Sequence, residues 1–344
     1  MRRPELIKGL LGMCILAFAS LSITSSALGQ LNSMSKEELI KYTAKGTFER
    51  FPDGRPKVPD ALLEKVREMS AEEVLGIIRQ GYPGQFVSGM QILTPGKTLV
   101  GRAFTLQLMP QRPELVEVLA AERAAKGLGR LTHQSALDML QEGDVFVVDA
   151  FGNLDAGGIV GDNLAYYIWK TAKTGFVIDG AIRDLEGIAK FNMPGYYRGA
   201  VPPAIHNLVV TGINVPVRIG NTTVLPGDVV LGDREGVFFI PPHLVEGIVE
   251  QAEITHIHDV WTKKKFDEGK YKSTEIYGRP SDPALIKEYE DYLKKELGPE
   301  KYQRYTQRQR QGPQGRAPGQ RPPGAQQETL ADFDELVPGS LRSP

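Results

Sequence analysis

The sequence has very little cysteine, because its 344 residues include only Cys14. This residue lies in an N-terminal segment that we expect to be removed, so the mature chain would have no disulfide, thiol nucleophile or cysteine metal ligand. An excess of charge of one sign is also absent, since 41 basic and 42 acidic residues give a net charge of −1. This balance provides no general attraction to nucleic acid or to an anionic membrane, and we expect neither as a partner.

Long apolar runs are scarce as well, and the most prominent one is at the N-terminus. Three basic residues precede an apolar run at residues 10–19, and the segment ends in Ala27-Leu28-Gly29. This order is typical of a secretory signal peptide and predicts cleavage near Gly29–Gln30. An uncleaved anchor is an alternative, but the run is short for a hydrocarbon core of ~30 Å. Lipid attachment at Cys14 is another, although bulky Met13 occupies a position that normally holds a small residue. We therefore expect a periplasmic or secreted protein with no membrane association after cleavage.

Hydrophobic patterning divides the chain into five segments: a signal peptide (1–29), an N-terminal extension (30–58), a main domain (59–265), a C-terminal helical extension (266–307) and a disordered tail (308–344). The tail is rich in Gln, Pro, Gly and Arg, a composition that cannot bury enough apolar surface to offset the entropy of ordering. The main domain alternates strand and helix signals: strands at 98–108, 145–149 and 176–178, helices at 113–126 and 162–173, and short strands from 195 to 240. This order predicts an α/β domain with some parallel pairing, and Asp179-Gly180 is expected to form a turn.

Two strand-to-helix junctions of this domain carry polar residues. At the first, Gly161-Asp162-Asn163-Leu164 leads from a glycine-rich loop into a helix, whose exposed N–H groups can hold a carboxylate. At the second, Arg183 offers a planar fork for a carboxylate or enolate oxygen, and Asp184 offers hard oxygen ligands for Mg²⁺ or Mn²⁺. Both junctions are expected at the carboxyl ends of neighbouring strands, where open α/β sheets build their sites. A purely structural interpretation stays open, since glycine loops and capping Asp residues are common devices.

Four separated stretches resemble one known family. They are 100–105 (VGRAFT), 161–165 (GDNLA), 175–184 (GFVIDGAIRD) and 226–237 (PGDVVLGDREGV). In this order, over about residues 60–260, they are similar to the RraA-like family, which includes class II 4-hydroxy-4-methyl-2-oxoglutarate aldolases. The resemblance implies a layered α/β/β swivelling-type domain, here with N- and C-terminal helical extensions. It also implies a homotrimer or hexamer, with the extensions wrapping neighbouring subunits.

The resemblance also implies an activity and a set of roles. The amides of Gly161 to Leu164 would hold the substrate carboxylate, Arg183 would contact the oxo-acid oxygen, Asp184 would bind a divalent metal, and Asp162 would position a metal-bound water. The reaction would be cleavage of a 4-hydroxy-2-oxo acid to pyruvate and a second carbonyl compound, or decarboxylation of oxaloacetate. Catalysis would depend on stabilising the pyruvate enolate by the metal and Arg183.

One position departs from the aldolase pattern, which has an acidic residue three positions after the Arg-Asp pair. That position is Gly187, and the nearest carboxylate is Glu186, about 100° away around a helix. A non-catalytic exported binding or regulatory protein is therefore the alternative. A methyltransferase is disfavoured, because no glycine-rich nucleotide loop with an acidic ribose partner follows an early strand. His206 is a weaker substrate-side candidate, and His256 and His258 are a weak metal pair because their spacing places them on different helix faces.

Overall fold

The computed structural model describes residues 33–78, 82, 84–125, 127, 129–130, 132–278 and 280–311. The predicted signal peptide and residues 312–344 of the predicted tail lie outside the described residues. The chain forms two compact units, with the division between Thr255 and His256.

The first unit is built on a mixed sheet, which has nine strands among the described residues. The path is β1-β11-β10-β3-β4-β5-β6-β2, and β7 pairs with β3 outside it. The central strands β3 (Leu99–Pro110), β4 (Asp144–Asn153), β5 (Phe176–Ile182) and β6 (Gly195–Ala200) are parallel, as the alternating order predicted. The remaining strands are antiparallel: β1 (Phe86–Val87), β2 (Gln91–Ile92), β7 (Leu208–Ile213), β10 (Val229–Gly232) and β11 (Val237–Ile240).

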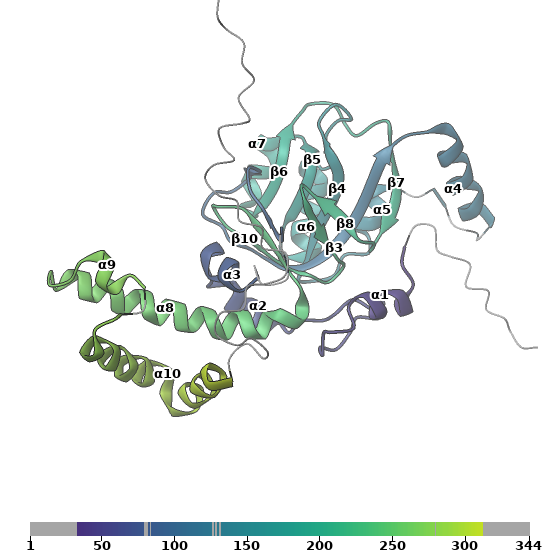
Figure 1. Cartoon of the computed structure of the whole chain (residues 1–344). Helices are drawn as coiled ribbons and strands as arrows, with labels where there is room; N and C mark the ends of the chain where they lie inside the picture. The colour runs from purple at the N-terminus through teal and green to yellow at the C-terminus, as the bar shows by residue number, and fades with distance from the viewer. Residues whose placement is uncertain are drawn as a thin grey trace, which may run out of the picture. The chain divides into compact units, whose positions relative to one another are not determined.

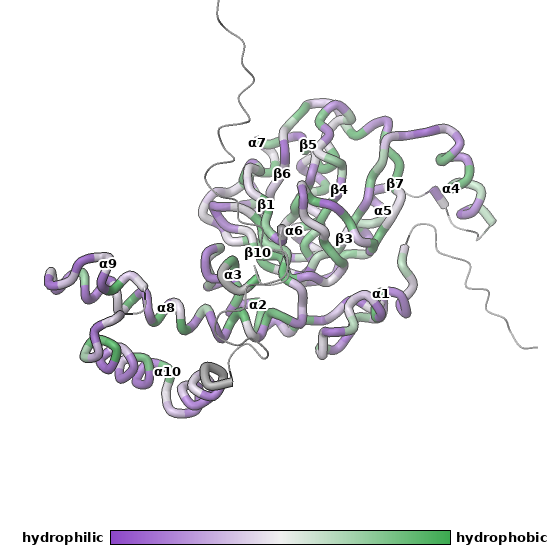
Figure 2. The backbone as a smooth tube through the Cα atoms, viewed as in Figure 1, coloured by the Kyte–Doolittle hydropathy of each residue, from purple (hydrophilic) through white to green (hydrophobic). Residues whose placement is uncertain are grey.

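Both faces of the central strands are covered, which gives three layers (Figure 1). On one face, alternate strand residues pack with helices α5 (His133–Leu137), α6 (Asp162–Ala172) and α7 (Leu185–Ile188). On the other face, the intervening residues pack with the hairpin of β8 (Val217–Ile219) and β9 (Thr222–Val224). Burial on both faces explains why four apolar residues follow Asp144 in β4 and why β5 is largely apolar, and the hydropathy of the chain is coloured in Figure 2. The predicted α/β/β layering is confirmed.

The predicted turn at Asp179-Gly180 is wrong, because both residues lie inside the fully buried strand β5. The Asp179 carboxylate accepts a hydrogen bond from the Gly220 N–H at 2.9 Å and pairs with Arg198 Nε at 2.5 Å. Since a buried carboxylate needs such partners, Asp179 fastens the segment after β8 to the sheet. Local turn propensity is overridden by this tertiary contact.

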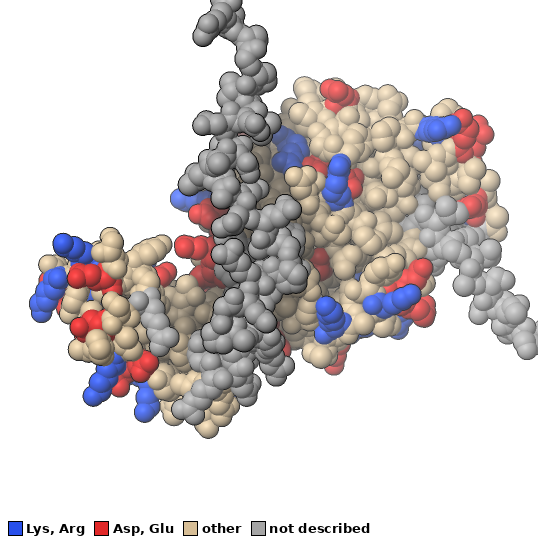
Figure 3. All heavy atoms as spheres, viewed as in Figure 1, with Lys and Arg blue, Asp and Glu red and all other residues tan. Residues whose placement is uncertain are grey.

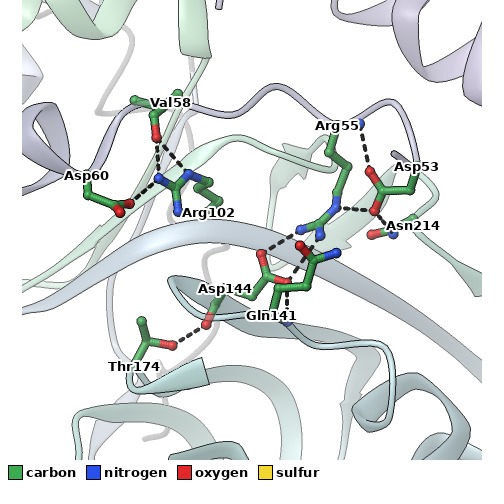
Figure 4. A network of polar contacts seen from close by, with 9 residues as sticks. All are labelled: Asp53, Arg55, Val58, Asp60, Arg102, Gln141, Asp144, Thr174 and Asn214. Atoms are coloured by element: carbon green, nitrogen blue, oxygen red, sulfur yellow. Dashed lines mark hydrogen bonds and ion pairs between the residues drawn. The ribbon is translucent and has the colours of Figure 1, made fainter. Parts of the chain in front are cut away.

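The N-terminal extension folds back onto its own domain. It contains α1 (Lys36–Tyr42), which begins with a capping box between Ser35 and Glu38. Farther on, Arg55 is fully buried and its guanidinium bonds both carboxylate oxygens of Asp144 at 2.7 and 3.2 Å, while its Nε donates to Asp53 (Figure 4). The expectation that this segment wraps a neighbouring subunit stays a prediction, but Arg55 and the residues that follow it contact their own domain. They pack on the chain's own sheet.

Three further helices cover the end of the sheet formed by β10 and β11. They are α2 (Asp60–Arg67), α3 (Ala71–Ile78) and the start of α8 (Val245–Asp267), which follows the 3-10 turn Pro242–Leu244. The guanidinium of Arg102 in β3 donates to the Val58 carbonyl and to Asp60, which attaches the start of α2 to the sheet (Figure 4). The remaining elements of this unit are α4 (Pro113–Ala125) and the 3-10 turn Ala189–Phe191.

The second unit is helical and consists of the end of α8, α9 (Ser273–Ile276) and α10 (Pro283–Gln311), which is interrupted at Gly298. Its core contains Trp261, Ile276 and Leu285. Lys265 lies in the last turn of α8, where its side chain is only 8% exposed and contacts Glu268 at 2.8 Å and Glu288 at 2.5 Å. Basic and acidic side chains lie interspersed on the face seen in Figure 3. Among the described residues, no helix has the length and apolar character needed to cross a membrane.

Candidate functional site

The glycine-rich loop between β4 and α6 is held between two other segments. The Gly158 N–H donates to the Pro203 carbonyl at 2.8 Å, and the Ile205 N–H donates back to the Gly158 carbonyl at 3.1 Å. On the other side, the Arg183 N–H donates to the Val160 carbonyl at 2.9 Å. These backbone bonds bring the two predicted junctions together, because β4 and β5 are parallel neighbours whose carboxyl ends share one edge.

The close approach of the loop to Arg183 and Asp184 explains why positions 158 and 161 are glycines. A Cβ at Gly158 would lie 2.7 Å from the Cβ of Arg183, and a Cβ at Gly161 would lie 2.4 Å from Asp184 Oδ2 and 3.0 Å from Arg183 Nε. The absence of a side chain at these positions lets the Arg-Asp pair reach the start of α6. The structure therefore brings Gly161, Arg183 and Asp184 into contact.

The Arg183-Asp184 pair has a distinctive backbone. Asp184 has φ 59° and ψ 41°, in the left-handed region that is uncommon for residues other than glycine, and its side chain does not cap α7. Its Oδ2 instead lies 3.4 Å from Arg183 Nε. The two side chains are 38% and 36% exposed, so both can be reached by a solute. A residue held in such a conformation is a candidate for function.

At the start of α6, Asp162 Oδ1 accepts a hydrogen bond from the Asn163 N–H at 2.7 Å. The other N–H groups of the first turn have no acceptor within the helix. The carboxylate of Asp162 also lies against Gly187, where a Cβ would be 2.8 Å from Asp162 Oδ2 and 2.7 Å from its Cβ. The space that an acidic side chain at position 187 would need is therefore partly taken by Asp162. This contact gives a physical reason for the departure at Gly187.

A cavity of about 250 Å³ opens at these residues. Its lining contains Gly161, Asp162, Asn163, Leu164 and Arg183, which are the predicted substrate-binding set. Asp184 is not part of the lining, although its carboxylate touches the loop and Arg183. The arrangement places helix-terminal amides and one guanidinium around a small space, a combination suited to an organic anion.

The cavity also has lining residues that sequence analysis did not single out: His133 and Gln134 from the start of α5, and Ala204 and Ile205 from the segment before β7. Burial lowers the pKa of His133, which favours the neutral imidazole. Neither segment carries a recognisable motif, and spacing along the chain gives no signal that they meet. The backbone bonds between Gly158 and residues 203–205, and the packing of α5 against the sheet, bring them to the loop.

The other histidines are placed differently. His206 is exposed, and its Nδ1 lies 3.0 Å from the Ala204 carbonyl. His258 packs against Trp261 and Tyr289 with ring centroids 6.3 and 5.2 Å apart, while His256 is exposed. Within the described part of the chain, no three His, Cys, Asp or Glu side chains gather in a way that could hold a metal ion. The weak prediction of a metal pair at His256 and His258 gains no support.

The comparisons with known proteins point to one family. The RraA-like family model, described as Aldolase/RraA, matches residues 71–239. A protein of Halalkalibacterium halodurans, provisionally named a 4-hydroxy-4-methyl-2-oxoglutarate aldolase, is 32% identical over 153 residues, which cover 43% of this chain and 70% of that protein. The 4-hydroxy-4-methyl-2-oxoglutarate aldolase of Thermus thermophilus is 30% identical over 99 residues, 29% of this chain and 60% of that protein. The chain belongs to the RraA-like family.

Solved structures agree on the fold. Streptomyces coelicolor RraAS2, described as an unusual member of the RNase ES inhibitor RraA protein family, is 28% identical with a TM-score of 0.50, covering 62% of this chain and 98% of that one. An uncharacterized protein from Pseudomonas syringae has a TM-score of 0.53 at 22% identity, covering 65% and 94%, which shows the fold alone. The named relatives therefore include both aldolases and a member of an inhibitor family.

Proposed function

We propose that this protein is a divalent-metal-dependent lyase that cleaves or decarboxylates a small 2-oxo acid. The observation that carries the proposal is the convergence of Arg183 and the start of α6 on one cavity of about 250 Å³. The names of the aldolase relatives support the reaction class. The substrate type is a 4-hydroxy-2-oxo acid or oxaloacetate.

In this proposal the start of α6, from Gly161 to Leu164, binds the substrate carboxylate at the positive end of the α6 dipole, through those N–H groups that do not donate to Asp162. Arg183 donates to the 2-oxo oxygen, where negative charge develops as the enolate forms. Its exposure of 38% leaves the guanidinium open to a ligand while Asp184 fixes its orientation. Asp162 is the first residue of α6, and its Oδ1 is oriented by the Asn163 N–H.

The residues present fit a hard cation held largely by water. Mg²⁺ commonly uses one or two carboxylates and keeps several water ligands. Asp184 supplies one exposed carboxylate beside the cavity, and Asp162 supplies a second that can bind through water. When bound, the metal would polarise the oxo-acid oxygens as a Lewis acid. Mn²⁺ accepts the same oxygen ligands.

The alternative is a non-catalytic binding or regulatory protein on the same scaffold, because a fold does not fix an activity. Gly187 favours it, since the acidic residue of the aldolase pattern is absent and Asp162 occupies part of its space. The Streptomyces relative is described as a member of a family of ribonuclease inhibitors, which suggests that this alternative would act by binding another protein. Regulation of a cytoplasmic ribonuclease conflicts with the predicted signal peptide, so the alternative we retain is an exported binding protein.

The test is release of pyruvate from a panel of 4-hydroxy-2-oxo acids and from oxaloacetate, with Mg²⁺ or Mn²⁺ and with a chelator. We expect metal-dependent turnover in the wild type, and a loss of about 100-fold or more in Arg183→Ala because an electrostatic stabiliser is removed. Asp184→Asn should raise the metal concentration needed for half-maximal activity. The matched control is Arg112→Ala, since Arg112 is an exposed arginine paired only with Glu114 among the described residues. Equal inactivity of wild type and Arg183→Ala across the panel would favour the binding protein.

We further propose that the protein acts in the periplasm or outside the cell as a homotrimer or hexamer. The predicted signal peptide supports the location, and the family supports the assembly. N-terminal sequencing of the exported protein and light scattering of the purified chain test these two points. A mature protein that retains Met1, or a monomer at micromolar concentration, would contradict the respective proposal.

A further inference from the structure

A second and larger cavity adjoins the candidate site. Its volume is about 590 Å³, and three of its lining residues, His133, Gln134 and Ile205, also line the smaller cavity. The two spaces therefore share a wall formed by the start of α5 and the segment before β7. We call the larger space the annex.

The walls of the annex are mostly apolar. Buried Leu108, Leu119 and Val210 come from β3, α4 and β7, and partly buried Leu208 lies beside them. A surface of this kind accommodates an alkyl or aromatic body, because burying apolar area is favourable at roughly 25 cal/mol per Å². A group as small and polar as pyruvate would not fill an apolar cavity of this size.

The polar part of the annex is basic. Arg123 and Arg130 line it together with His133 and His206, and no Asp or Glu is among its described lining residues. Arg123 Nε donates to the Gly129 carbonyl at 2.7 Å, which orients its guanidinium fork. A basic cavity without a carboxylate favours an anionic group, and an oriented guanidinium binds a carboxylate in bidentate fashion.

We propose that the annex binds the part of the substrate beyond the scissile bond, and that this part is an extended, largely apolar chain ending in an anionic group. This inference rests on the proposed lyase function and names its substrate class. Ligand pockets usually measure about 300–1,000 Å³, so the 250 Å³ cavity suits only the oxo-acid end of a larger molecule. The shared residues His133, Gln134 and Ile205 mark where the chain passes from one space to the other.

The reaction balances within this arrangement. The C3–C4 bond of the 4-hydroxy-2-oxo acid breaks, and its electron pair stays on the three-carbon fragment as an enolate. The C4 hydroxyl loses its proton and becomes the carbonyl of the product held in the annex. The enolate takes up a proton from water at C3 to give pyruvate, which balances the proton that the C4 hydroxyl releases to water. No oxidant or reductant is needed.

Equilibrium binding tests the inference without depending on turnover. Calorimetry in the presence of Mg²⁺ compares pyruvate, 2-oxooctanoate and 2-oxooctanedioate, which differ first in chain length and then in a terminal carboxylate. We expect the diacid to bind at least about tenfold more tightly than pyruvate, because charge-assisted hydrogen bonds and apolar burial both add affinity.

Two variants locate the effect. Ala120→Trp places a large side chain from an exposed position of α4 into the annex, and should remove the advantage of both long acids over pyruvate. Arg123→Gln should lower the preference for the diacid over 2-oxooctanoate about tenfold. Arg112→Gln is the matched control on the same segment, because Arg112 does not line the annex. Circular dichroism confirms that each variant is folded.

The outcomes separate the two proposals. If pyruvate binds but neither the longer chain nor the terminal carboxylate increases the affinity, the annex is not a substrate site and the lyase proposal stands. A diacid preference that survives both Ala120→Trp and Arg123→Gln would place it elsewhere and overturn the annex. If none of the three acids binds with or without Mg²⁺, the proposed function fails and the substrate class fails with it.

Discussion

The buried pair of Arg55 and Asp144 allows a prediction about how the N-terminal extension stabilises the domain. Both side chains are 0% exposed and their charged atoms are 2.7 Å apart. Asp144 also accepts from the Gln141 N–H at 2.9 Å, and the Arg55 guanidinium lies 5.0 Å from the ring centroids of Phe51 and Phe104. Burial raises the pKa of Asp144, and Arg55 offsets this only in part. The carboxylate therefore depends on its partner.

Arg55→Met removes the cation and leaves the Asp144 carboxylate buried. Breaking a buried pair in this way costs about 3–5 kcal/mol, whereas removing both charges leaves no buried carboxylate without a partner. We therefore expect Arg55→Met to lower the free energy of unfolding by about 3–5 kcal/mol, and the double variant Arg55→Met/Asp144→Asn to recover most of the loss. A loss of 3 kcal/mol corresponds to a fall in Tm of roughly 6–12 °C for a unit of this size.

The assay is urea unfolding followed by tryptophan fluorescence. The sequence has two tryptophans, one in each unit, so a Trp261→Phe background leaves Trp169 in α6 to report on the first unit alone. A double-mutant cycle then gives the coupling between Arg55 and Asp144. If the single and double variants lose the same stability, the reasoning is wrong, because Arg55 would then act through its contacts with the rings or with Asp53 and not through the Asp144 carboxylate.

Three other predictions concern single residues. Burial raises the pKa of Asp228 to about 7, so the folded state holds this proton more tightly than the unfolded chain. The free energy of unfolding should therefore fall by up to about 1.4 kcal/mol per pH unit between about pH 4 and 7. Asp228→Asn should flatten that part of the pH profile in urea titrations. A profile equally steep in the variant would contradict this origin. Gly158→Ala should weaken pyruvate binding by displacing Arg183, with a loss of stability of about 1–3 kcal/mol from overpacking, and unchanged calorimetric affinity would refute the close approach. Lys265→Met should destabilise the second unit by about 1 kcal/mol or less, because Glu288 is 48% exposed and water can replace its partner. Unfolding followed by Trp261 fluorescence in a Trp169→Phe background measures the change, and a loss of several kcal/mol would contradict this solvent screening.

Much of the architecture follows from local sequence. The run near the start of β4, at residues 145–148, is hydrophobic without alternation, which predicts a strand covered on both faces. The junctions at Gly161 and Arg183 could be placed at one edge of the sheet because parallel strands align their carboxyl ends. The α/β alternation and the convergence of the two loops could therefore be predicted from the residues, whereas the layered arrangement was implied by the resemblance to the RraA-like family.

The tertiary structure decided what depends on contacts between distant residues. Arg55 and Asp144 are 89 positions apart, and neither position carries a local signal of a buried pair. The pair Asp179-Gly180 is typical of a turn, but both residues lie in β5. There the Gly220 N–H, just after β8, donates a hydrogen bond to the Asp179 carboxylate. The annex exists because β7 returns beside β3 and brings Ile205 to His133. Local propensity involves a few neighbouring residues, whereas partner, burial and cavity are set by how the whole chain packs.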